Sequence, residues 1–384
     1  MNSHRIILGM VWAVVLALEV QAGSLRLIRQ ISLKEHVREP AGLLGAPTHH
    51  VRMISFSPDE KRLAIVAGDH WLHENDPRTH VLIVSTENIA VGFEDLVPGV
   101  EYFRKRLIWS PDSQKLLLPG KGSLLTLDGE LAGTCQQQSW KSAMELGTGD
   151  EGGFLKNDEF AIAFLIPPPR HLPNRVRYRM EGDTRLITFD TMCEPKHAWT
   201  INGHPLAMDA NPETGFAVVS MMWSGLVLFD TRNGKEVQRW EKEGFEHVQF
   251  FDNGKGICRT AEPKVDARPQ CWELSSRGVT QKEAPVRSGT PFSTSSRGTL
   301  IAFTNATYRY NPFTHFGADG VKDHVLWDYS TGKIVVRWKP SMQKVEHNLE
   351  LAESEVPWVF SLSSTGKYLA EGGAGIVKIY EVLR

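Results

Sequence analysis

Hydrophobic and polar residues alternate in short runs along most of the chain, and the runs come in pairs joined by turn-forming residues. The segments Ile54–Val66 (ISFSPDEKRLAIV) and Leu107–Leu118 (LIWSPDSQKLLL) each contain an alternating run, a Ser-Pro-Asp turn and a second apolar run. Alternation with a period of two is typical of β-strands. Pro and Asp favour the turn because Pro presets φ and Asp bonds its own backbone. Each segment therefore predicts a β-hairpin.

The same hairpin pattern recurs with less regular turns, which makes it an internal repeat. Five further copies complete a set of seven: Gly153–Phe164, Ala207–Ser220, Val248–Thr260, Phe292–Thr304 and Val359–Glu371. Turn residues at fixed offsets within a recurring unit are the sequence signature of repeat folds.

A third strand follows each hairpin and, except in the first copy, ends on an acid. The first copy ends at Ser85, and the others end at Asp128, Asp190, Asp230, Glu273, Asp328 and Glu381. We expect these carboxylates to accept hydrogen bonds from amides of the following turn. A fourth strand comes next, as in Lys235–Trp240 and Lys333–Trp338. Seven units of four short strands predict an all-β fold, a seven-bladed β-propeller.

The two ends of the chain fit a closed ring. After Glu381 only Val382, Leu383 and Arg384 remain, too few for a fourth strand, whereas Ser24–Leu33 (SLRLIRQISL) is a strand without a blade of its own. Closure satisfies backbone groups that an open sheet edge would leave unpaired. We therefore expect this N-terminal strand to complete the last blade.

The extreme N-terminus has the organisation of a secretory signal peptide. His4 and Arg5 precede an apolar stretch, 6–18, and Val20-Gln21-Ala22 supplies small residues for cleavage before Gly23. The stretch is shorter than the ~20 residues that span a bilayer, and an uncleaved signal anchor is the alternative. We predict a signal peptide at 1–22 and a single propeller domain at 23–384. We expect the mature chain to be secreted or periplasmic, without a membrane span.

The Ser-Pro-Asp hairpins and the third strands that end in Leu-Trp-Asp or Leu-Phe-Asp resemble those of WD-repeat propellers. They are also similar to the repeats of periplasmic TolB-type propellers, and the resemblance covers nearly all of residues 24–384. It implies a seven-bladed propeller and, through the periplasmic relatives, an exported bacterial protein. Because such families consist mostly of scaffolds that bind proteins or peptides, it implies a binding role here.

Four cysteines, an even number, suit an exported chain that meets an oxidising compartment. Cys258 and Cys271 fall in the second and third strands of one unit, which are antiparallel neighbours, so we predict a disulfide between them. Cys135 and Cys193 fall in adjacent units, near strand ends expected on opposite faces, which disfavours their pairing. Buried free thiols are the alternative for both pairs.

The longest insertions are predicted to share one face of the disc. In a four-stranded blade, the link between the second and third strands lies on the same face as the link to the next blade. Long insertions occupy this link at 68–80, 166–184 and 305–324, and a shorter one occupies it at 261–270. Loops that extend from one face of a rigid scaffold often carry binding residues.

These insertions are rich in arginine and aromatic residues, which favours a binding surface. Arginine donates forked hydrogen bonds to carboxylates, and aromatic rings give broad, rigid contacts that are common interface hot spots. The candidate binding residues are Trp71, Arg170, Arg175, Arg177, Tyr178, Arg179, Tyr308 and Tyr310. The predicted partner is a protein or peptide, with a glycan as an alternative. The other interpretation is that the loops only pack together, with arginines paired to Asp183, Asp266 and Asp323.

Charge and motifs argue against other classes. The net charge is −2 with both signs interspersed, whereas nucleic-acid binding needs a clustered positive field. His70, His73 and His80 could bind zinc, but they are spread along a loop, and we predict no metal site and no cofactor. No nucleophile elbow, P-loop, Rossmann or zinc-protease motif is found. A hydrolase or lyase at the channel mouth remains the alternative to a non-catalytic binder.

Overall fold

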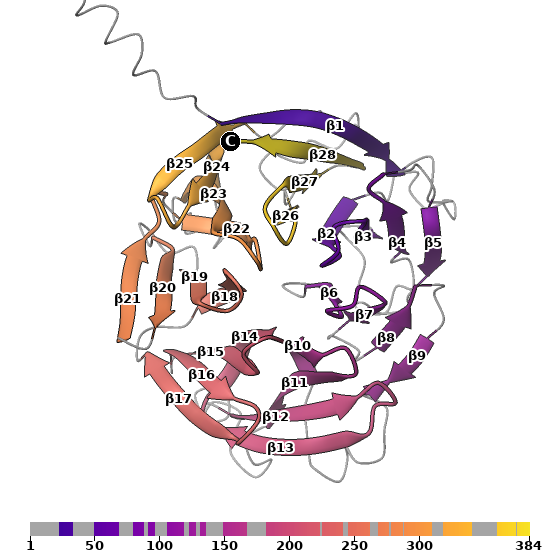
Figure 1. The fold of residues 1–384 in the computed structure, drawn as a ribbon, viewed down its shortest axis with the longest axis vertical. Helices are drawn as coiled ribbons and strands as arrows, with labels where there is room; N and C mark the ends of the chain where they lie inside the picture. The colour runs from indigo at the N-terminus through magenta and orange to yellow at the C-terminus, as the bar shows by residue number, and fades with distance from the viewer. Residues whose placement is uncertain are drawn as a thin grey trace, which may run out of the picture.

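The computed structural model describes the greater part of the chain as seven sheets around a central axis (Figure 1). The described residues are 23–33, 50–68, 80–87, 91–96, 106–118, 123–127, 131–135, 149–166, 182–222, 225–240, 245–261, 268–275, 278–286, 288–308, 318–339, 359–373 and 375–384. Each sheet has four antiparallel strands. The predicted seven-bladed β-propeller is confirmed.

The strands follow one another blade by blade, from the centre of the ring to its rim. Blade 1 contains β2 (His50–Phe56), β3 (Arg62–Gly68), β4 (His80–Ser85) and β5 (Val91–Leu96), and blade 2 contains β6 (Ile108–Trp109), β7 (Lys115–Leu118), β8 (Ser123–Thr126) and β9 (Leu131–Thr134). Blade 3 contains β10 (Gly149–Lys156), β11 (Glu159–Ile166), β12 (Asp183–Asp190) and β13 (Pro195–Ile201), and blade 4 contains β14 (His204–Asn211), β15 (Phe216–Met222), β16 (Gly225–Asp230) and β17 (Lys235–Trp240). Blade 5 contains β18 (Phe245–Phe251), β19 (Gly256–Ala261), β20 (Gln270–Ser275) and β21 (Gly278–Glu283), and blade 6 contains β22 (Ser288–Thr294), β23 (Leu300–Tyr308), β24 (Ala318–Asp328) and β25 (Lys333–Trp338).

The N-terminal strand completes blade 7, as predicted. This blade contains β26 (Val359–Leu362), β27 (Tyr368–Gly372), β28 (Ile376–Leu383) and, at the rim, β1 (Ser24–Ser32). β1 pairs antiparallel with β28 from Ser24 opposite Leu383 to Ser32 opposite Ile376. Figure 1 shows the first and last strands of the chain side by side at the rim.

Serine side chains fix the turns of the first hairpins. In blades 1 and 2, Ser57 Oγ accepts the amide of Arg62 at 3.0 Å, and Ser110 Oγ accepts that of Lys115 at 2.8 Å. Each serine also donates to the aspartate of its Ser-Pro-Asp turn. Ser295 and Ser363 accept the amide five residues later in the same way, so the copies in blades 6 and 7 keep the same turn.

Three of the acids that end the third strands, Asp190, Asp230 and Asp328, cap the following turns, as expected. Asp190 Oδ1 accepts the amides of Met192 and Glu194 at 2.9 and 3.0 Å. Asp230 accepts the amide of Arg232, and Asp328 that of Ser330, each at 3.0 Å.

The outer strands turn along the rim instead of crossing it. The pairing of third and fourth strands contains a register shift near the end of the third strand in five blades, at Ile83/Val84, Leu124/Leu125, Thr188/Phe189, Leu228/Phe229 and Leu326/Trp327. Such bulges increase the twist of a sheet. Accordingly, the outermost strands in Figure 1 follow the circumference of the ring.

This twist explains a disulfide that the sequence disfavoured. Cys135 follows β9 in blade 2, and Cys193 lies in the turn between β12 and β13 in blade 3. Their Cα atoms are 4.9 Å apart and their sulfurs are bonded. The expectation that these strand ends lie on opposite faces is wrong, because an outer strand that runs along the rim carries its end to the neighbouring blade.

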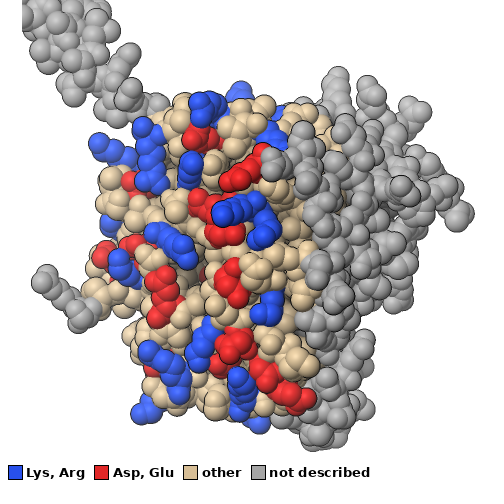
Figure 2. All heavy atoms as spheres, turned by 45° about the vertical axis from the view of Figure 1, so that its right-hand side comes forward, with Lys and Arg blue, Asp and Glu red and all other residues tan. Residues whose placement is uncertain are grey.

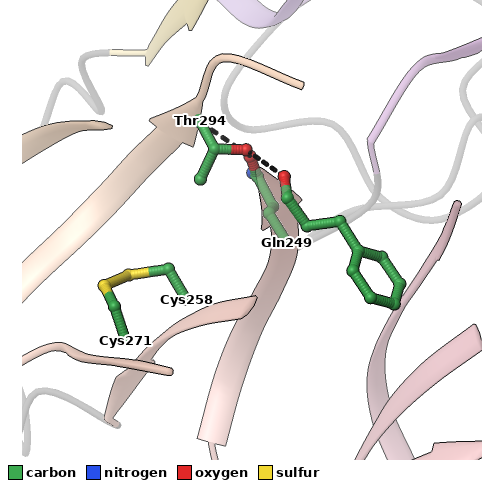
Figure 3. Close-up of a disulfide and its surroundings, with 5 residues drawn as sticks. Gln249, Cys258, Cys271 and Thr294 are labelled. Atoms are coloured by element: carbon green, nitrogen blue, oxygen red, sulfur yellow. Dashed lines mark hydrogen bonds between the residues drawn. A yellow bond between two sulfur atoms is a disulfide. The ribbon is translucent and has the colours of Figure 1, made fainter. Parts of the chain in front are cut away.

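The second disulfide, Cys258–Cys271, is the predicted one and lies within blade 5 (Figure 3). Both cysteines are buried in a core cluster with Phe303 and Trp327 of blade 6. Apolar clusters of this kind fill the spaces between neighbouring blades, and their burial is the main force that holds the ring together.

Candidate functional site

The second strands of all blades run in the same direction through the ring, and this gives the disc two different faces. We call the face where the second strands end the link face, and the opposite one the turn face. Links on the link face leave from Gly68, Ile166, Ala261 and Tyr308, the ends of β3, β11, β19 and β23. The strand ends that carry the four predicted insertions therefore lie on one side of the disc.

The predicted binding residues lie mostly outside the described residues. This holds for Trp71, Arg170, Arg175, Arg177, Tyr178, Arg179 and Tyr310. Tyr308 ends β23, where its backbone pairs with Ala318. The assignment of a binding role to these eight residues stays a prediction.

The alternative interpretation pairs Asp323 with arginines of the insertions. In the structure its carboxylate accepts from Asn305 Nδ2 at 2.6 Å and from Arg337 Nη1, on the neighbouring strand β25, at 2.9 Å. Asp323 is therefore engaged within the sheet of blade 6.

In blades 4 to 7, a side chain near the end of the inner strand connects neighbouring inner strands. It lies three positions before the turn residue of its hairpin, which is Pro212, Asp252, Ser296 or Ser364. In four consecutive blades this side chain accepts the backbone N–H of the next blade's inner strand. The bonds run from Phe250 to Asp209 (2.7 Å), from Thr294 to Gln249 (3.0 Å), from Leu362 to Ser293 (2.9 Å) and from Phe56 to Ser361 (3.4 Å). Figure 3 shows Gln249 and Thr294 in this arrangement. The inner strands are thus joined around the channel by side chains as well as by packing.

Blade 3 replaces this bond with close backbone contact. Gly153 occupies the equivalent position, and a Cβ there would lie 2.6 Å from Ala210 Cβ and 2.8 Å from the Ala210 nitrogen in blade 4. Arg106, which precedes β6 in blade 2, bonds Asp209 Oδ1 in blade 4 at 2.7 Å and also the Met208 carbonyl. One side chain therefore connects the two blades that flank blade 3.

The turn face carries a second set of bonds between blades. The Asp59 amide donates to Ser113 Oγ at 3.0 Å, which joins blades 1 and 2. Glu60 accepts from the Thr365 amide and hydroxyl, which joins blades 1 and 7. Burial of Glu60 acts to raise its pKa, but the hydrogen bonds from the blade 7 turn outweigh this and hold the pKa below its usual value. These contacts join blades 7, 1 and 2 to one another on the turn face.

Charges of both signs are mixed over the described surface. In Figure 2, Lys and Arg side chains alternate with Asp and Glu over the described part that faces the viewer. This agrees with the interspersed charge of the sequence and shows no field of one sign on that surface.

Two buried polar groups were missed by sequence reasoning. Arg259 on β19 lies under the link face, 2% exposed. Its Nη2 donates to Gln270 Oε1 at 2.5 Å, its guanidinium lies 4.7 Å from the Trp272 ring centre, and burial lowers its pKa to about 9. An arginine inside the apolar second strand GICRTA is the signal that could have found it.

The second buried group is a His–Glu pair between blades 6 and 7. His324 on β24 and Glu371 on β27 face each other, and neither is exposed to solvent. The pair meets one expectation for a catalytic site, because burial displaces the pKa of both residues. However, it lies on a second and a third strand within the blade seam and has no access to the channel, so it cannot contact a substrate in this conformation.

Among the described residues, no group of three or more His, Cys, Asp or Glu side chains could hold a metal ion. His70 and His73 lie outside the described residues, as does the side chain of His80. No helix in the described part of the chain is long and apolar enough to cross a membrane.

Comparison with known proteins supports the fold. The chain is similar to the β-propeller domain of Cps50 (Swd1) from Myceliophteria thermophila, with a TM-score of 0.59 and 13% sequence identity over 93% of this chain and 99% of that domain. The fold is that of a seven-bladed β-propeller. No protein-family model and no curated protein matches the sequence. The likeness concerns architecture, and the bacterial origin and TolB-type relationship implied by the sequence stay predictions.

Proposed function

We propose that this protein is an exported, non-catalytic binding scaffold that recognises a protein or peptide through its link face. The observation that carries the proposal is the asymmetry of the disc. The turns between first and second strands span two to five residues in every blade, whereas the link-face segments 69–79, 167–182 and 309–317 are much longer. Long loops on one face of a rigid ring are a common binding arrangement.

The composition of these segments favours a protein partner. Segment 167–182 contains Arg170, Arg175, Arg177 and Arg179 around Tyr178. Arginine and tyrosine are enriched among interface hot spots, because both bury large areas while keeping directional hydrogen bonds. A peptide or protein with exposed carboxylates is the partner that this composition fits.

Two features support export. The residues before Gly23 have the order of a signal peptide, with a positive start, an apolar stretch and small residues at the end. The described cysteines are all paired in two disulfides, and stable disulfides are typical of oxidising compartments. We propose that residues 1–22 are removed and that the mature chain begins at Gly23.

Shortening one insertion tests the binding face. Ile166 and Asp183 are directly paired across β11 and β12, so an Asn-Gly turn can replace 167–182 with little effect on the ladder. A matched control replaces exposed lysines on the turn face, Lys156→Ala and Lys255→Ala.

Partners are captured with the mature protein in an oxidising buffer like that of an exported compartment. The affinity of each captured partner is then measured for both variants. We expect the loop variant to lose at least one partner that the lysine variant binds as tightly as the unchanged protein. Equal affinity of every partner for all three proteins would reject this choice of face.

A further inference from the structure

In the described part of the chain, one buried contact between ionisable groups crosses the seam between blades 6 and 7. His324 Nε2 lies 3.6 Å from Glu371 Oε1, and the two side chains are 0% and 1% exposed. This distance is beyond the range of a hydrogen bond, and neither atom has a hydrogen-bond partner among the described residues. The Trp338 side chain also acts on Glu371 and opposes the rise of its pKa.

The surroundings of the pair are mainly aromatic. The His324 ring lies between Trp338 and Phe360, with ring centres 5.2 and 5.3 Å away. Its Nδ1 is 3.2 Å from Thr304 Oγ1, and Glu371 Oε2 accepts from the Tyr380 hydroxyl at 3.4 Å. A net charge in such an environment raises the free energy of the folded state, because few polar groups replace the water that would hydrate the charge.

Two charged groups of the described chain act on the pair from neighbouring positions. Asp323 precedes His324 on β24 and is itself bonded to Arg337 of β25. Lys378 lies opposite Glu371 in the pairing of β27 with β28. Burial nevertheless dominates: it lowers the pKa of His324 to about 4 and raises that of Glu371 to about 7, against smaller opposing effects of these neighbours.

We propose that His324 and Glu371 hold one proton between them and act as a proton-linked joint between blades 6 and 7. To share the proton, the two side chains must close from 3.6 Å to hydrogen-bond distance, with either the carboxylic acid donating to a neutral imidazole or the imidazolium donating to a carboxylate. Both forms have zero net charge. A second proton or the loss of the shared one leaves a net charge in the aromatic seam.

The joint lies next to the closure of the ring. Blade 7 is the blade that β1 completes, and the apolar cluster of this seam includes Leu25 of β1 together with Phe360 and Leu326. A loosened seam would therefore affect the contact that closes the propeller.

The shared proton fixes how many protons the pair binds in the folded and the unfolded chain. In the unfolded chain the histidine holds a proton below its usual pKa of 6.5, and the glutamate releases its proton above 4.5. Between these values the unfolded pair and the folded pair each hold one proton, so the pair contributes no pH dependence to stability there.

Single variants should reveal two opposite slopes. In Glu371→Gln the folded pair holds no proton while the unfolded histidine still takes one. Relative to the unchanged protein, the unfolding constant of this variant should fall about tenfold per pH unit as pH rises from 4.5 to 6.5. In His324→Gln, the unfolding constant should rise about tenfold per pH unit between pH 4.5 and 6.5, because the glutamate then holds a proton only in the folded state.

The test is urea unfolding of both variants and the double variant at several pH values. Lost packing changes stability equally at every pH and leaves these slopes intact, and the double variant should return to the slope of the unchanged protein. Single variants that keep that slope would overturn the proposal.

A second measurement needs no variant to fold. The unchanged protein, with isotope-labelled histidine, is followed by NMR through a pH titration. One imidazole should keep its N–H proton from exchanging with solvent, and it should gain no net charge between pH 6.5 and 4.5. If every imidazole takes up a proton near pH 6.5, the joint does not exist.

Discussion

Removing the disulfide between blades should destabilise the propeller more than removing the one within a blade. Cys135 and Cys193 are 58 residues apart in sequence, and Cys258 and Cys271 are 13 apart. On loop-closure entropy alone, the first bond contributes about 4 kcal/mol and the second about 3 kcal/mol. The geometry acts in the same direction, because Cys258 and Cys271 are already neighbours in the ladder of β19 and β20.

The comparison uses two double variants, Cys135→Ala with Cys193→Ala and Cys258→Ala with Cys271→Ala. All four side chains are buried, so both variants lose similar packing and serve as controls for each other. Urea unfolding followed by tryptophan fluorescence gives the free energies of unfolding, and alkylation of the unreduced protein checks that no thiol is free. If the variant without the bond between blades is as stable as the other or more stable, the reasoning from loop length and blade docking is wrong.

Three further predictions concern the contacts between inner strands and use the same unfolding assay. Gly153→Val should cost about 1–3 kcal/mol because its side chain would overlap Ala210 of blade 4, and an unchanged midpoint would show that the blades separate without cost. Asp209→Ala should cost about 3 kcal/mol because it removes acceptors for both Arg106 and the Phe250 amide; a loss no larger than that of the exposed Asp112→Ala would contradict this. Ser361→Ala should cost about 1 kcal/mol through the unpaired Phe56 amide, and a stabilised variant would refute the role of that bond.

Local chemistry explains why the blades could be predicted from the sequence. The Ser-Pro-Asp turns depend on hydrogen bonds between residues at most five positions apart, such as those of Ser57 and Ser110, so their signal is contained in one segment. The closing strand could be predicted by counting the strands of each unit. The last unit has only three strands, and Ser24–Leu33 is a strand that belongs to no other unit.

Features that depend on the relation between blades could not be predicted in this way. The Cys135–Cys193 bond requires the twist that brings a rim strand to the next blade, and no local pattern gives that angle. His324 and Glu371 come from different repeats, and their distance follows from the packing of two sheets. Glu371 did interrupt the apolar strand YLAEG, which was a usable sign of an unusual position but did not identify its partner.

The ring of seven blades is closed by the N-terminal strand, which pairs with the last strand of the chain. Hydrogen exchange of the mature protein, read by mass spectrometry, tests this directly. We predict that the amides of 24–32 that face β28 exchange slowly and become exchangeable together with those of 376–383, since the two strands form one ladder. Complete exchange of 24–32 within the first seconds, while 376–383 stays protected, would contradict it.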